Sequence, residues 1–159
     1  MKAKVKPFIE CCKISIAGLL VLTCLSCKEE EQQPTAIQPV QIAQGNMYGG
    51  GSENIPKQDV VIATPAEWAS LLEAMSSPYG VDFAEREVDF TKYAVIAVFE
   101  EVKGNGGWSI DITDVTEYAD KITVTVRSLK TGDLTSVLTQ PFHVVKIAAS
   151  GKMIEFKHV

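Results

Sequence analysis

The chain contains only two histidines, His143 and His158, so any histidine-dependent catalysis must use one of them. A serine hydrolase places its histidine beside an activated serine, but the sequence has no Gly-x-Ser-x-Gly motif. His143 lies in an alternating segment just after Pro141, which favours a structural hydrogen-bonding role over catalysis. The sequence also lacks His-x-x-x-His spacing, so it predicts no zinc site and no other metal site.

Carboxylates could in principle support acid-base or calcium chemistry. Glu100 and Glu101 are adjacent, and adjacent residues of a strand point to opposite faces, which disfavours a paired acid and base. A further acidic string consists of Asp111, Asp114, Glu117 and Asp120. It lacks the ligand offsets and the glycine of a calcium loop, so we expect solvated charges on a hairpin. The sequence therefore predicts a noncatalytic protein without a cofactor.

A glycine-rich segment from 103 to 108 is the best candidate contact surface. It leads into a predicted strand and lacks the Gly-Lys-[Ser/Thr] ending of a phosphate-binding loop, so it predicts a tight turn whose glycines adopt positive φ. Aromatic side chains are frequent at binding hot spots, and an aromatic residue follows the turn. The candidate binding residues are Lys103, Gly104, Gly106, Gly107, Trp108 and, from a later strand, His143.

The N-terminus resembles a bacterial lipoprotein signal peptide. A lysine-rich start precedes a short apolar run from 14 to 25, and the small Ser26 stands immediately before Cys27. Twelve residues are fewer than the roughly 20 that a membrane-spanning helix requires. We expect lipidation at Cys27; the alternatives are lipidation at Cys24, which follows the branched Thr23, and an ordinary signal peptide cleaved elsewhere. The predicted location is the cell envelope, as an outer-membrane lipoprotein, with surface exposure suggested by the acidic run after Cys27.

Composition divides the chain into a signal peptide over 1–26, an acidic tether over 27–37 and one domain over 38–159. Residues 27–159 carry 11 basic and 19 acidic side chains, a net charge of −8, which disfavours nucleic acid as a partner. All four cysteines lie at or before Cys27, so the domain has no disulfide. Its stability must come from an ordinary apolar core.

The elements that would position these residues are mainly strands. Thr64, Pro65 and Glu67 predict a capped helix start, and Trp68 begins an apolar stripe at helical spacing. The helix is expected to end near 76–78. An unbroken apolar run predicts a strand covered on both faces. The predicted strands are 39–43, 59–63, 93–99, 108–116, 121–127, 141–147 and 153–156, with 108–116 and 121–127 forming a hairpin. This pattern predicts a mainly β, α+β fold: an antiparallel sheet or sandwich of about seven strands with one packed helix.

The turn at 103–110, together with the segment Thr139-Gln140-Pro141-Phe142-His143 some thirty residues later, resembles the PrcB C-terminal-domain family. The resemblance extends over roughly 60–147, with Trp108 where members often carry Tyr and with 131–133 lacking a common proline. It implies an accessory role beside an exported protease and brings no catalytic residues. Beside this membrane-anchored binding module, the alternative is an envelope lipoprotein that binds a small molecule or a glycan near the glycine-rich turn.

Overall fold

The computed structural model describes residues 33–76 and 80–159, and its strands form two four-stranded sheets. The predicted signal peptide, Cys27 and most of the predicted tether lie outside the described residues. Within the described residues no helix is long and apolar enough to cross a membrane. In chain order, the elements are β1 (Thr35–Ala36), β2 (Val40–Met47), β3 (Gln58–Ile62), α1 (Pro65–Ala74), β4 (Tyr93–Phe99), β5 (Asp111–Glu117), β6 (Lys121–Arg127), β7 (Gln140–Ala148) and β8 (Met153–His158).

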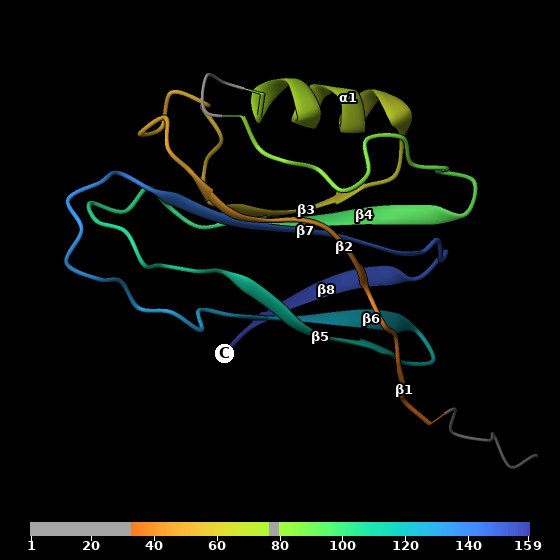
Figure 1. Ribbon diagram of the computed structural model, residues 1–159. Coiled ribbons are helices and arrows are strands. Elements are labelled where there is room, and N and C mark those ends of the chain that lie inside the picture. Colours follow the sequence, from red (N-terminus) through yellow and green to blue (C-terminus); the bar gives the residue numbers. More distant parts are fainter. Residues whose placement is uncertain (1–32, 77–79) are drawn as a thin grey trace, which may run out of the picture. The chain divides into compact units, whose positions relative to one another are not determined.

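The two sheets lie face to face, and α1 covers the outer face of one of them (Figure 1). The β7 sheet has the strand order β2-β7-β4-β3 and is antiparallel throughout. The β5 sheet has the order β1-β5-β6-β8, in which only β6 and β8 run parallel. The predicted β-rich α+β fold with one packed helix is therefore confirmed.

Strand β4 explains why there are two cores. Its apolar run alternates between faces, so Val95, Ala97 and Phe99 pack beneath α1, while Ile96 and Val98 pack between the sheets. All five of these side chains are fully buried. The prediction of a strand covered on both faces is confirmed.

The predicted helix start forms as a capping box. The Thr64 hydroxyl accepts from the Glu67 N–H at 3.3 Å, and the Glu67 carboxylate accepts from the Thr64 N–H at 3.1 Å. The apolar stripe points to the sheet: Trp68 and Met75 are buried, and two leucines between them are partly buried. Trp68 is thus a core residue, as predicted.

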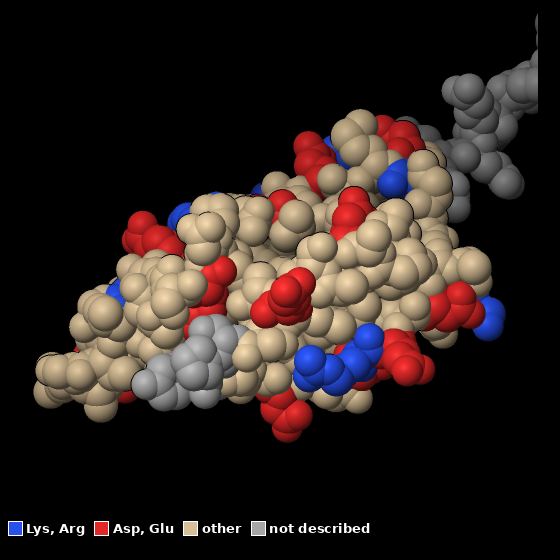
Figure 2. Space-filling model, turned by 90° about the horizontal axis from the view of Figure 1, so that it is seen from above, with Lys and Arg blue, Asp and Glu red and all other residues tan. Residues whose placement is uncertain are grey.

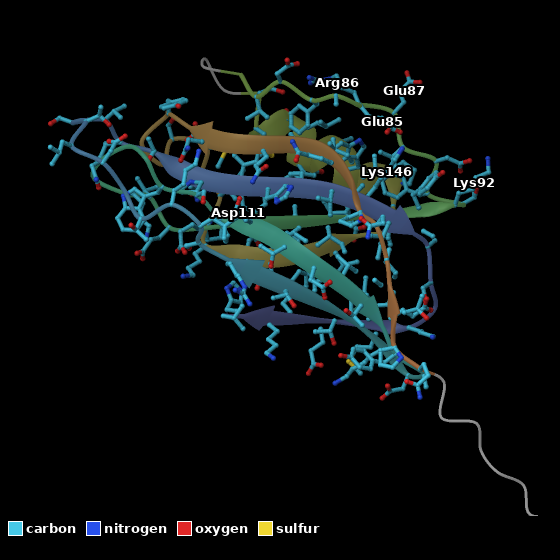
Figure 3. The ribbon with its side chains drawn as sticks, turned by 60° about the horizontal axis from the view of Figure 1, so that its bottom comes forward. Glu85, Arg86, Glu87, Lys92, Asp111 and Lys146 are labelled. Atoms are coloured by element: carbon cyan, nitrogen blue, oxygen red, sulfur yellow. The ribbon has the colours of Figure 1, made fainter. Side chains whose placement is uncertain are left out.

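The segment after α1 contacts both the helix and the β7 sheet. The Trp68 Nε1–H donates to the Arg86 carbonyl at 2.9 Å, and Lys146 on β7 forms an ion pair with Glu85 (Figure 3). The Lys146 ammonium also lies 4.6 Å from the centre of the Tyr93 ring. On this face acidic side chains are scattered among uncharged residues rather than gathered together (Figure 2).

Two details depart from the sequence prediction. Strand pairing in the described chain begins at Thr35, within the predicted tether of 27–37, because β1 pairs with β5. The strand expected from 108 begins only at Asp111. The last two predicted strands are confirmed as β7 and β8, which belong to different sheets.

Candidate functional site

The glycine-rich turn pairs with a second loop at one end of the sandwich. Residues 103 to 108 run alongside the loop from 130 to 139, with bridges Lys103 to Thr139 and Trp108 to Thr131 at the two ends. Between these bridges the Asp133 N–H donates to the Gly106 carbonyl at 2.9 Å. We call the segments 48–54, 101–108 and 129–138 the loop end.

The three candidate glycines have different roles. Gly107 has φ 73°, a left-handed conformation that glycine adopts readily, and a Cβ there would lie 2.7 Å from the Asp133 carboxylate carbon. A Cβ at Gly106 would lie 2.4 Å from the Thr135 hydroxyl oxygen, whereas a Cβ at Gly104 would meet open space. The predicted positive φ is therefore confirmed for Gly107 alone among these three, and Gly106 is required for the close approach of two loops.

Trp108 is half-buried and held on several sides. Its Nε1–H donates to the Asn105 amide oxygen at 2.9 Å, and the Lys103 ammonium lies 4.9 Å from its ring centre. Gly132 lies so close that a Cβ there would approach the indole to 2.7 Å. Trp108 thus contributes to the architecture of the loop end, and its cross-loop pairing explains why β5 begins later than predicted.

Lys103 belongs to a small charge network at the end of β4. Its ammonium lies 2.8 Å from the Glu101 carboxylate and 3.9 Å from that of Glu100, and Lys57 binds Glu100 at 2.7 Å. Burial raises the pKa of Glu100, but the hydrogen bonds from Lys57 and from the Glu101 N–H outweigh it, and its pKa is lowered overall. The two glutamates share one lysine because β4 ends at Phe99 and strand alternation does not continue through them. Both carboxylates therefore act as partners of cations.

His143 lies between the sheets. Its Nδ1 accepts a hydrogen bond from the Ile112 N–H at 2.9 Å, and its Nε2 is buried without a partner among the described residues. Burial lowers the pKa of His143, although the nearby Asp111 opposes this effect. The hydrogen bond agrees with the predicted structural role. His143 does not line the hollow beside Trp108, so the structure does not unite it with the glycine-rich turn as one surface.

A polar hollow of about 360 Å³ lies beside Trp108, and sequence reasoning missed most of its residues. Its polar lining comprises Gln44, Asn46, Ser109, Asp111 and Lys130. The predicted solvation of the acidic string is wrong for Asp111, which is only 8% exposed at the start of β5 (Figure 3). Gln44 and Leu129, both distant in sequence, reach the Asp111 carboxylate, so no local signal marked Asp111 as buried.

Large apolar side chains are unusually exposed at the loop end. Leu134 is fully exposed, and Leu138 is half exposed. The other exposed apolar side chains of this region are Tyr48, Val102, Leu129 and Val137. Leu138 packs against Gly50, and Val102 against Gly51, so segments distant in sequence meet here. Contiguous exposed apolar patches often mark interaction sites.

A family model described as PrcB C-terminal matches residues 94–148. The matched segment runs from β4 through β7 and includes both the glycine-rich turn and the loop that pairs with it. The match confirms the resemblance to the PrcB C-terminal family. No curated protein and no solved structure matches the chain.

The match is consistent with a noncatalytic accessory module associated with a protease complex. The described residues contain no cluster of three or more metal-ligating side chains. His158, the other histidine, pairs with Asp59 at 2.7 Å, which links β8 to β3 across the two sheets. The strongest candidate for function is therefore the loop end, with its apolar residues and the adjoining hollow.

Proposed function

We propose that this chain is a lipid-anchored, noncatalytic accessory module of the cell envelope that binds an exported protease complex through its loop end. The observation that carries this proposal is the set of exposed apolar side chains at the loop end, within or next to the segment that matches the PrcB C-terminal family. Leu134 stands fully in solvent at the tip of the pairing loop. Burial of such side chains by a partner contributes free energy in proportion to the apolar area removed from water.

Cross-loop contacts also order part of the loop end for docking. Gly106, Gly107 and Trp108 hold the two loops together by cross-loop hydrogen bonds and close contacts. A preorganised surface loses less conformational entropy on binding than a free loop does. The proposed anchor at Cys27 would keep this surface near other envelope proteins, and its support comes from the sequence pattern around Cys27.

The test is affinity purification of the tagged protein from its own envelope, comparing wild type with Leu134→Asp. We expect the wild type to recover a protease subunit reproducibly and Leu134→Asp to lose it, because a charge at the tip opposes burial. Met153→Asp is the matched control, because Met153 is an exposed apolar residue on β8, outside the loop end. Equal recovery by wild type and Leu134→Asp would contradict docking at the loop end.

A further inference from the structure

We propose that the hollow beside Trp108 binds a guanidinium or ammonium group, with Asp111 as its anionic partner. The hollow holds about 360 Å³ and is lined by residues of β2, of the segment leading into β5, and of the loop after β6. That volume is sufficient for the end of one basic side chain or for a small organic cation. The inference extends the proposed function where a partner protein supplies the cation, but the binding step does not depend on that function.

The Asp111 carboxylate is buried without a cation among the described residues. Its three hydrogen-bond donors are all neutral: the Gln44 amide at 2.6 Å, the Ser109 hydroxyl at 2.5 Å and the Leu129 N–H at 3.2 Å. A carboxylate has about four acceptor positions, so one remains free. Burying an uncompensated charge costs free energy, and an incoming cation would lower that cost.

Asn46 also lines the hollow and carries a buried acceptor without a partner among the described residues. Its amide N–H donates to the Trp108 carbonyl at 3.3 Å, while its Oδ1 is buried and has no partner among the described residues. Buried polar atoms are nearly always hydrogen-bonded, so an unpaired oxygen at a hollow points to a missing donor. A guanidinium or ammonium group carries several N–H donors and could bind Asp111 and Asn46 together.

Lys130 is the only basic residue that lines the hollow in the described part of the chain. Its backbone exchanges hydrogen bonds with Ser109: its N–H donates to the Ser109 hydroxyl at 3.0 Å, and its carbonyl accepts from the Ser109 N–H at 3.2 Å. Its ammonium forms no ion pair with Asp111. Lys130 therefore leaves Asp111 uncompensated and opposes an incoming cation by charge repulsion alone.

The experiment uses the full-length protein in detergent and follows the side-chain amide NMR signals of Gln44 and Asn46. The probes are ethylguanidinium, ethylammonium and the neutral ethylurea, titrated at constant ionic strength. We expect saturable shifts with the two cations and about tenfold weaker binding of ethylurea, because charge-assisted hydrogen bonds are the stronger ones. Equal binding of ethylurea and ethylguanidinium would overturn the assignment.

Variants isolate the role of Asp111. Asp111→Asn should weaken ethylguanidinium binding about tenfold, while Asp114→Asn, the same change at an exposed position of the same strand, should leave it unchanged. Should Asp111→Asn fail to fold, the exposed Lys130→Gln provides the second test, with tighter ethylguanidinium binding expected because repulsion is removed. Unchanged affinity in folded Asp111→Asn, or in Lys130→Gln where that test is needed, would refute the proposal.

Envelope purification separates this inference from the proposed function. Loss of partner recovery in folded Asp111→Asn would show that the cation is a side chain of the partner, whereas unchanged recovery with weakened ethylguanidinium binding would assign the hollow to a free organic cation. Absence of ethylguanidinium binding with intact partner recovery would refute only the proposal that the hollow binds a cation. Binding of ethylguanidinium without partner recovery would refute only the accessory function.

Discussion

His143 shows how a titratable residue can be structural. Its Nδ1 accepts the N–H of Ile112 on β5, and acceptance at that nitrogen requires the neutral ring. The sequence indicated this role from the position of His143 in an alternating strand. The partner could not be predicted, because His143 on β7 and Ile112 on β5 lie 31 positions apart and belong to different sheets.

We predict that His143 makes stability pH-dependent below about pH 6.5. Burial lowers its pKa from the ordinary value of 6.5, so the unfolded chain binds this proton at a higher pH than the folded chain. The free energy of unfolding should therefore be fully retained above pH 6.5 and should fall as the pH drops below it. Denaturant titrations across this range should show a shallower fall for His143→Gln than for wild type, and His158→Gln should retain that fall. A fall of the same depth in His143→Gln would rule out this source.

Asp111 illustrates the limit of reading single residues. Its spacing with Asp114 and Glu117 suggested an exposed acidic string, and for Asp114 that interpretation agrees with the structure. Asp111 differs because Gln44 on β2 and Leu129 after β6 both reach its carboxylate. Contacts between residues 67 and 18 positions apart leave no pattern in a single sequence. The hollow therefore could not be predicted from the sequence, because it depends on how distant strands meet in the fold.

At the scale of elements, strong local sequence patterns were sufficient to predict where several strands and the helix begin. The unbroken apolar run gave β4, the strict alternation gave β6, and the capping residues gave the start of α1, each within about a residue of its observed bounds. Pairing partners were harder to predict. The parallel contact between β6 and β8 joins strands separated by β7, which no local alternation encodes.

The glycine-rich turn gives a prediction for the loop end as an element. Gly107→Ala should destabilise the protein by roughly 1–2 kcal/mol or more, because an alanine in the left-handed conformation is strained and its Cβ would meet Asp133. Gly104→Ala is the matched control, since a Cβ there meets open space. Thermal unfolding of the two variants provides the comparison. Equal unfolding temperatures for both variants would show that the turn tolerates a side chain at Gly107.

For the whole molecule, the proposed anchor at Cys27 would decide where the domain acts. We expect Cys27→Ala to release the protein from the membrane fraction, because attached acyl chains contribute about 0.8 kcal/mol for each buried CH₂. Cys24→Ala should remain in the membrane fraction, since we place lipidation at Cys27. Fractionation followed by immunoblotting checks both variants. Release of Cys24→Ala with retention of Cys27→Ala would transfer the anchor to the other cysteine.

The β5 sheet is bounded by the first and last strands of the described chain. Strand β1 closes one edge, and β8 closes the other by lying parallel to β6, with Ile154 and Phe156 packed on the core between the sheets. A nascent polypeptide that stops before residue 153 would contain the β5–β6 hairpin, but β6 would be an unpaired edge strand. The apolar core residues that Ile154 and Phe156 cover would then be exposed. The two sheets of the described domain are therefore complete only once β8 is present, and products that lack it would be exposed to proteolytic quality control.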